Sequence, residues 1–479
     1  MSTYQSIKRL ALLLLIGLSF GACNSWLDVT PSDSVTEEKL LSTKEGFHQA
    51  LNGIYLDLNI DSLYGATLLC SDIEILAQRY SINNNNSNYT DLANYKYKTT
   101  YPKQVFQGTW NTAYNLILST NKLLENADLK KDILGTEYDL FRGELLGLRA
   151  MLHFDLLRLF GPVLALHPND KAIPYKTSGS PITSPILTAG EVIEKIMVDL
   201  KNAETALAND PIKTQGPNFG SNTDNFWSSR SMRLNYYAVK GLEARVALYA
   251  VPLKESYKNE AYEAATSIIK ENESKNLFPF VDPTEIQGTK PDRIFSTEVL
   301  FMNQNVRRVN KIFQAFFDPS LSAEKILLPD DEALSNLYAE TDYRYRPIWK
   351  SAPEKSGLCF YKYATVEKGR SNDMIPMIRL SEMYLIAAET AATQEEAIQY
   401  LNTLSMQRGT GAVSADDDVE SILINEYRRE FFGEGQLFFF YKRKNVSYIP
   451  ILSDMPWDSQ YVTPDVYVIP LPNSEIMYR

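Results

Sequence analysis

The stretch MIRLSEMYLIAAETAATQEEAIQYLNTLSMQRGTG, residues 377–411, decides the fold. Its first half predicts a helix, because small and apolar side chains recur every three or four residues and so share one face. These side chains are Ile378, Ser381, Leu385 and Ala388. Thr393 and Glu396 then indicate the capped start of a second helix. Its apolar face carries Ala397, Leu401 and Leu404. The two helices fit within one tetratricopeptide length of about 34 residues, so the stretch predicts a packed helix pair.

The same period continues towards the N-terminus and predicts further helices. Ser42 and Glu45, and again Thr188 and Glu191, have the spacing of a capping box at a helix start. A helix through residues 141–159 is expected to end at Gly161, a residue suited to a left-handed cap. Further helical faces are predicted from Trp110, Ala113, Ile117 and Leu124, from Leu234, Ala238, Leu242 and Val246, and from Ala261, Ala265 and Ile268.

The middle of the chain has a different character. Between about residues 278 and 375, proline and glycine recur and no long helical period survives, so we expect loops with short strands or helices. The predicted fold class is therefore mostly α. We expect a solenoid-like bundle with helices mainly at 42–273 and 377–445, and one large irregular, loop-rich region. Long irregular stretches on a compact scaffold often carry function.

The N-terminus has the pattern of an export signal. Lys8 and Arg9 precede an apolar run of 13 residues at 10–22, which is too short for a spanning helix of about 20 residues. A basic start, a short apolar run and small residues before Cys23 are typical of a cleaved leader. Phe20-Gly21-Ala22-Cys23 resembles a bacterial lipobox. We therefore predict a lipoprotein signal peptide at 1–22 and lipidation at Cys23, the alternative being an ordinary signal with an incidental cysteine.

Composition argues against several other classes of protein. The formal net charge is −11, whereas nucleic-acid binding needs clustered basic residues. Beyond Cys23 only Cys70 and Cys359 remain, too few for a disulfide framework or a zinc site; whether they bond to each other stays open. Residues 416–418 are three aspartates, but they lack the ligand spacing of an EF-hand. No metal and no cofactor are expected, and a structural calcium ion stays open.

No catalytic motif is present. The chain contains no nucleophile elbow, HExxH sequence or P-loop. A glycoside hydrolase needs a pair of carboxylates across the scissile bond, and the 59 acidic residues leave such a pair possible in principle. We predict no catalytic residues and retain a glycan-degrading enzyme as an alternative hypothesis.

Several segments together resemble the SusD/RagB family of Bacteroidetes outer-membrane lipoproteins. They are GELLGLRAMLHFDLLRLFGPV (143–163), RLNYYAVKGLEARVALYA (233–250), IRLSEMYLIAAETA (378–391), LNTLSMQRGTG (401–411), NEYRREFFGEGQLFFFYKR (425–443) and YVIPLPNSEI (467–476). The resemblance implies one SusD-like domain at 23–479 with four tetratricopeptide-like helix pairs. It also implies a cell-surface, lipid-anchored protein of the outer membrane that captures glycan and serves as a lid on a SusC-like TonB-dependent transporter. In such a protein the helix pairs would face the transporter and the irregular side the ligand. RagB-like relatives suggest peptide or glycoprotein as an alternative ligand.

Three features of this sequence add detail to the resemblance. Arg379 and Glu389 lie on otherwise apolar helices and are predicted to be buried partners. Residues 427–432 alternate charged and aromatic side chains, which favours a structural ion-pair network. Leu437 and Phe440 stand where the family pattern has Arg and Asp, three positions apart on a helix. Because both charges are lost together, we expect local repacking and no buried, unpaired charge.

Ligand capture would fall to aromatic and polar side chains in loops. A sugar ring stacks its C–H face on an aromatic ring, while amides, carboxylates and guanidinium groups bond its hydroxyls. The candidates are Asp72, Arg79, Tyr80, Tyr89, Tyr95, Phe226, Trp227, Tyr343, Trp349 and Trp457. For each of them, packing at the surface or in the core is the alternative interpretation.

Overall fold

The computed structural model describes residues 36–83, 85–218, 225–353, 355, 357–369, 371–452 and 459–477. The chain divides into a small unit, Met1–Phe47, and a large unit, His48–Arg479. Helix α2 spans Glu37–Leu40, and α3 spans Lys44–Asp57. The start of α3 differs from prediction, because the N–H of Gly46 donates to the hydroxyl of Thr43 (3.1 Å) while the Ser42 hydroxyl donates to the Lys39 carbonyl. Thr43, and not Ser42, therefore caps α3.

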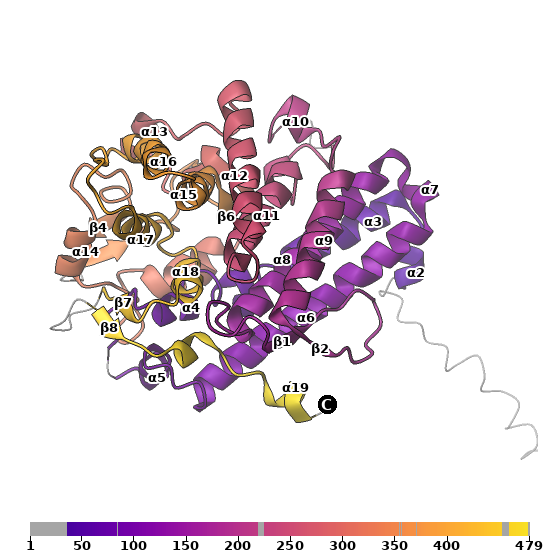
Figure 1. Ribbon diagram of the computed structural model, residues 1–479, viewed down its shortest axis with the longest axis horizontal. Helices are drawn as coiled ribbons and strands as arrows, with labels where there is room; N and C mark the ends of the chain where they lie inside the picture. The colour runs from indigo at the N-terminus through magenta and orange to yellow at the C-terminus, as the bar shows by residue number, and fades with distance from the viewer. Residues whose placement is uncertain are drawn as a thin grey trace, which may run out of the picture. The chain divides into compact units, whose positions relative to one another are not determined.

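The large unit is built on a series of helices in which each member packs against the next. The series consists of α6 (Thr100–Leu129), α8 (Tyr138–Phe160), α9 (Ala189–Ala206), α11 (Tyr236–Ala250), α12 (Ser256–Lys275), α15 (Leu380–Thr390), α16 (Gln394–Gln407) and α17 (Val419–Glu430). Figure 1 shows it running from purple α6 and α8 through α11 and α12 to orange α15 and α16. The protein is thus mostly helical, as predicted.

The sequence signals at helix ends are confirmed at two sites and corrected at a third. Thr188 and Glu191 form the predicted capping box at α9, and the N–H of Glu396 donates to Thr393 at α16. Helix α8 does end before Gly161, but that residue has φ −77° and is extended. A Cβ at Gly161 would lie 2.6 Å from the Leu157 carbonyl oxygen. The glycine is needed there for a close approach of backbone, and not for a left-handed cap.

Helix α8, the second member of the series, is buried along most of its length. It packs against α6 and against α9, and every residue from 143 to its end at Phe160 is buried. A helix covered on all sides must place its polar residues against partners. Arg149 accordingly donates two hydrogen bonds of 2.6 Å to Asp199 of α9.

The irregular region contains only short elements among its described residues. They include α13 (Pro283–Gln287), β3 (Val299–Gln304), a π-helical turn (Val309–Phe317), α14 (Asp331–Leu337), β4 (Trp349–Ser351), β5 (Leu358–Phe360) and β6 (Met374–Arg379). Strand β3 pairs antiparallel with β6, and β4 with β5. Strand β6 is followed directly by α15. The β3–β6 pair therefore holds both ends of the segment 305–373 next to the helical series.

The remaining elements are short as well. They are α4 (Asp72–Leu76), α5 (Ser87–Ala93), α7 (Lys131–Leu134), β1 (Lys171–Pro174), β2 (Ile186–Thr188), α10 (Ile212–Gln215), α18 (Leu437–Lys444), β7 (Tyr448–Pro450), β8 (Ser459–Tyr461) and α19 (Asn473–Met477). Strands β1 and β2 pair antiparallel, and so do β7 and β8.

A buried ionic network joins the irregular region to α16 and α17. Glu430 accepts hydrogen bonds from Arg344, Arg379 and Arg408, and all four side chains are nearly inaccessible to solvent. Arg408 also binds Glu298 at 2.6 Å. The predicted structural network at residues 427–432 is thereby confirmed.

The predicted pairing of Arg379 with Glu389 is wrong in its partners. Both side chains are buried and paired, but Arg379, like Ile378, belongs to β6 and not to the predicted helix. It binds Glu430 and Glu434. Glu389 instead accepts two hydrogen bonds, of 2.5 and 2.8 Å, from Arg443 of α18. The sequence indicated that both charges need partners. Which residue of another element becomes the partner depends on tertiary packing.

The two apolar replacements on α18 are packed in the core. Leu437 and Phe440 are buried, and the ring of Phe440 stacks on Tyr427 with centroids 4.2 Å apart. Both positions are therefore filled by apolar packing and leave no unpaired charge there, as predicted.

Candidate functional site

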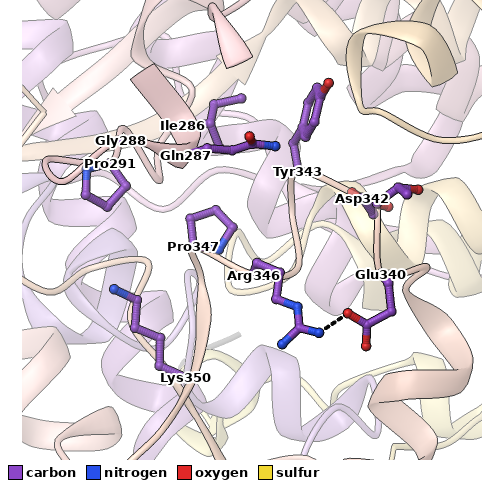
Figure 2. Close-up of a pocket in the computed structure, with 11 residues that line it drawn as sticks. Ile286, Gln287, Gly288, Pro291, Glu340, Asp342, Tyr343, Arg346, Pro347 and Lys350 are labelled. Atoms are coloured by element: carbon purple, nitrogen blue, oxygen red, sulfur yellow. Dashed lines mark hydrogen bonds and ion pairs between the residues drawn. The ribbon is translucent and has the colours of Figure 1, made fainter. Parts of the chain in front are cut away.

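An open cleft of about 400 Å³ lies in the irregular region, between the end of α13 and the start of β4 (Figure 2). Its lining combines apolar, aromatic and charged side chains, which is the usual composition of a small-molecule site. The lining residues are Ile286, Gln287, Gly288, Pro291, Glu340, Thr341, Asp342, Tyr343, Arg346, Pro347 and Lys350.

Tyr343 supplies the aromatic ring of the cleft and is half-buried. Its backbone N–H donates to the Arg408 carbonyl at 2.9 Å, and its ring lies against Gly409, the second residue after α16. Gly409 has φ +69°, and a Cβ there would lie 2.7 Å from Cε1 of Tyr343. A glycine is required at this position for both reasons. The helix end thus fixes where the ring lies.

The acidic groups of the cleft are paired. Asp342 accepts hydrogen bonds of 2.7 and 2.9 Å from the Arg344 guanidinium beneath it. Glu340 forms an ion pair with Arg346 at the exposed rim, shown as the dashed line in Figure 2. The cleft therefore presents hydrogen-bonding groups beside a flat aromatic face.

The predicted site residues between positions 72 and 95 form a first group. Three of them are buried and held by internal contacts. Asp72 accepts hydrogen bonds from Thr67, Ser71 and Tyr101. The Arg79 guanidinium lies 4.1 Å above the Phe432 ring, and the Tyr80 hydroxyl donates to the Cys70 carbonyl. A direct ligand contact by any of these three would require the covering chain to move.

Glu74 lies beside Arg79 and is also completely buried. Its carboxylate accepts the N–H groups of Gly433 and Gly435. Burial raises the pKa of Glu74 to about 7 although the Arg79 charge acts in the opposite direction. Sequence reasoning did not single out this residue.

Tyr89 and Tyr95 are half-buried, so part of each ring remains accessible. The Tyr89 ring meets Tyr101 edge to face, with centroids 6.0 Å apart. Tyr95 donates to the Leu76 carbonyl at 3.1 Å and has φ +55°. These two are the members of the first group that a ligand can reach without rearrangement.

Phe226 and Trp227 belong to a separate aromatic cluster at α3 and α8. The Phe226 ring stacks on His48 with centroids 3.7 Å apart, and Arg233 covers it at 3.9 Å. Trp227 is buried and meets Phe141 edge to face. The structure does not bring these residues to the Tyr343 cleft lining.

Trp349 is close to Tyr343 in sequence but is 3% exposed. It packs against Phe432 and Phe360, with ring centroids 4.7 and 4.9 Å away. The Trp349 side chain therefore belongs to the core on which the β4–β5 pair packs. Trp457 and Cys23 lie outside the described residues.

Three loops that are far apart in the sequence are joined by backbone hydrogen bonds. Ser81 donates to the Leu328 carbonyl, Asp330 to the Leu452 carbonyl, and Leu452 to the Gln78 carbonyl, at 2.7, 2.9 and 3.0 Å. The loop after α4, the irregular region and the β7–β8 hairpin therefore form one continuous structure.

Sequence reasoning missed two aromatic residues on that hairpin. Tyr448 and Tyr461 are a cross-strand pair, their ring centroids are 5.3 Å apart, and they are 62% and 63% exposed. The nearest sequence signal was their aromatic character, which does not distinguish exposure from burial.

Other kinds of site are not found among the described residues. No group of His, Cys, Asp or Glu there is arranged to hold a metal ion. Within the same residues, no helix has the length and apolar character needed to cross a membrane. Cys70 and Cys359 are both buried and are not bonded to each other.

Solved structures show the same fold. A SusD superfamily protein from Bacteroides thetaiotaomicron matches with a TM-score of 0.71 at 22% identity, covering 91% of this chain and 98% of that one. A putative sugar-binding protein from Bacteroides vulgatus matches with 0.70 at 21% identity, covering 91% and 96%. Surface glycan-binding protein A from Bacteroides thetaiotaomicron matches with 0.68 at 17% identity, covering 92% and 98%.

Family models extend the match to the sequence itself. No curated protein matches the chain. A SusD-like model described as starch-binding and associating with the outer membrane matches residues 25–221. The SusD family model matches residues 190–449, more than half of the chain. This protein therefore belongs to the SusD family, a family of non-catalytic glycan-binding proteins.

Proposed function

We propose that this protein captures glycan at the bacterial cell surface and that the Tyr343 cleft is where a sugar ring binds. The observation that carries the proposal is a half-buried tyrosine in an open cleft of about 400 Å³, flanked by charged side chains, in a SusD-family chain. A pyranose ring needs this combination of a flat face and hydrogen-bonding groups. Because the family is non-catalytic, the glycan-degrading hypothesis is not pursued.

The proposal includes an anchor at the outer membrane. It is supported by the lipobox-like sequence ending at Cys23 and by the family description that associates such proteins with the outer membrane. A diacylated cysteine with a third, amide-linked chain holds a protein stably at a bilayer, whereas one chain binds only marginally. Residues 1–22 would be the removed leader and 23–479 the mature domain.

The proposal also includes a partner. We expect the captured glycan to pass to a SusC-like TonB-dependent transporter, with the helical series facing it as four tetratricopeptide-like pairs. Three of these pairs are supported by the packing of α8 with α9, α11 with α12, and α15 with α16. Affinity purification from membranes in mild detergent should recover a large β-barrel protein.

Affinity electrophoresis against a panel of polysaccharides tests the central claim. We expect retardation by at least one glycan, and a loss of retardation in Tyr343→Ala. Tyr138→Ala is the matched control, because Tyr138 begins α8 and does not line the cleft. Retardation by no glycan, together with a peptide that co-purifies, would favour the peptide-binding alternative.

A further inference from the structure

The four charged side chains that line the Tyr343 cleft, two acidic and two basic, are not all paired. Both carboxylates that line it, Glu340 and Asp342, already have guanidinium partners in Arg346 and Arg344. Their charges are therefore not available to neutralise another cation at the cleft. What remains is the charge of Lys350, the first residue after Trp349 in β4.

Lys350 has no acidic partner within the described part of the chain. Its ammonium group lies 5.8 Å from the centroid of the Tyr361 ring, and it lines the cleft from the side away from the Arg346–Glu340 pair (Figure 2). Burial, reinforced by the nearby charge of Arg293, lowers the pKa of Lys350. The ammonium group is thus partly desolvated and has no counter-ion among the described residues.

Arg293 adds a second positive charge behind the cleft. It is buried, and its hydrogen bonds go to neutral acceptors, the carbonyls of Pro347 (2.7 Å) and Tyr361 (3.3 Å). Its guanidinium carbon lies 5.9 Å from the same Tyr361 ring. Two cations without an acidic partner among the described residues, Lys350 and Arg293, thus lie on one side of the candidate sugar site.

We propose that the cleft selects anionic glycans, with Lys350 binding a carboxylate or sulfate group on the sugar. This inference rests on the proposed glycan binding and adds the ligand class to it. A partly desolvated ammonium group binds an anion more strongly than an exposed one, because screening by water is weaker there. The volume of the cleft is adequate for a sugar residue that contacts both Tyr343 and the lysine side.

Four polymers separate the possible ligands. Polygalacturonate carries only carboxylates, dextran sulfate carries sulfates, and dextran and starch are neutral. We expect retardation in native gels by one or both anionic polymers and little by the neutral pair. For an oligomer of the retarding polymer, the affinity measured by calorimetry should fall as NaCl rises from 0.05 to 0.5 M, since the Debye length shortens to a few ångströms.

Substitutions then assign the effect to Lys350. Lys350→Gln should weaken binding by about tenfold or more, the usual loss for one charge-assisted hydrogen bond, whereas Lys350→Arg should retain most of it. Lys275→Gln is the matched control, because Lys275 is an exposed lysine on α12 that does not line the cleft, and we expect a change below about threefold. Thermal unfolding of each variant checks that the fold is intact.

The outcomes are distinguishable. Retardation by starch or dextran as strong as that by the anionic polymers overturns the inference and leaves the proposed function standing. Unchanged affinity in Lys350→Gln overturns it as well. Retardation by no polysaccharide at all removes the proposed function and, with it, the inference.

Discussion

Gly409 shows how one residue can fix a binding surface. Its φ of +69° lets the chain leave α16, and the absence of a side chain lets the Tyr343 ring lie directly over it. A left-handed conformation costs any other residue about 1–2 kcal/mol. The stability of the helix end and the position of the Tyr343 ring therefore both depend on the absence of a Cβ at residue 409.

We expect Gly409→Ala to lower the free energy of unfolding by about 1–3 kcal/mol and to weaken glycan binding, because a methyl group would push the Tyr343 ring away. Urea unfolding and affinity electrophoresis measure the two effects. Gly53→Ala is the control, since no atom lies within 4 Å of the added Cβ. That change should be neutral or stabilising by up to about 1 kcal/mol. Equal effects at both positions would contradict this account.

Glu430 has a comparable role in the buried ionic network. Its single carboxylate serves three arginines that have almost no contact with solvent, and their positive charges lower the pKa of Glu430 well below its ordinary value. Removing one member of such a network leaves buried charges without compensation.

Glu430→Gln should therefore lower the free energy of unfolding by about 3–5 kcal/mol. Chemical denaturation at neutral pH measures the change. Glu340→Gln serves as the matched control, because it breaks an ion pair whose two side chains are 68% and 70% exposed. Such a surface pair contributes only about 0–1 kcal/mol. A small loss for Glu430→Gln would mean that solvent reaches the network.

Helix α8 ties its neighbours together through polar groups as well as apolar ones. The His153 ring accepts the N–H of Lys176 at 2.9 Å and contacts the Arg149 carbonyl at 2.8 Å. It also stacks on Tyr175 with centroids 3.9 Å apart. Because the residue is completely buried, the pKa of His153 is lowered from 6.5 to about 3. The native fold thus holds this imidazole neutral.

The low pKa of His153 makes the free energy of unfolding depend on pH in a defined direction. The unfolded chain takes up a proton near pH 6.5 and the native chain does not, so the contribution of His153 is complete above pH 6.5. It is lost as the pH falls towards 3, by up to about 1.4 kcal/mol per pH unit. Urea midpoints at pH 7.5, 6.5 and 5.5 should show this loss.

A variant isolates the histidine from the titrating carboxylates. In His153→Gln the stability deficit relative to the parent protein should shrink as the pH falls from 7.5 to 5.5. His167→Gln is the control, because that side chain is 60% exposed, and its pH profile should follow the parent. A deficit in His153→Gln that stays constant with pH would show that the buried ring is protonated along with the unfolded one.

The irregular region depends on the helices for its own order. Its elements are short, and a two-stranded ribbon is only marginally stable alone. The β3–β6 pair and the Glu430 network attach it to α15, α16 and α17, and backbone hydrogen bonds join it to Leu452 after β7. The cleft is therefore built from loops that long-range contacts hold in place.

The proposed membrane anchor rests on one side chain, that of Cys23. We expect Cys23→Ala to release the protein from the outer-membrane fraction, because no acyl chain could then be attached. Fractionation and mass spectrometry of the mature N-terminus measure this. Cys70→Ala controls for loss of a thiol elsewhere and should remain in the membrane fraction. A variant at Cys23 that still fractionates with the outer membrane would contradict lipidation at this position.

The sequence by itself determined the features that depend on local spacing. Helical periodicity predicted α6, α8, α9, α11, α15 and α16, and the capping box at Thr188 was confirmed in detail. Motifs spread along the chain were sufficient to indicate the SusD family. These signals survive because a helix face and a cap are set by residues three or four positions apart.

Only the tertiary structure decided which of the candidate side chains a ligand can reach. Tyr343 and Trp349 stand six positions apart in one irregular segment, yet one lines a cleft and the other is 3% exposed beneath Phe432. Tyr448 and Tyr461 looked no different from buried tyrosines, and the missing counter-ion of Lys350 could not be read from its neighbours in the chain. Exposure depends on residues that are distant in sequence, such as Gly409 and Phe432, and these come together only when the chain has folded.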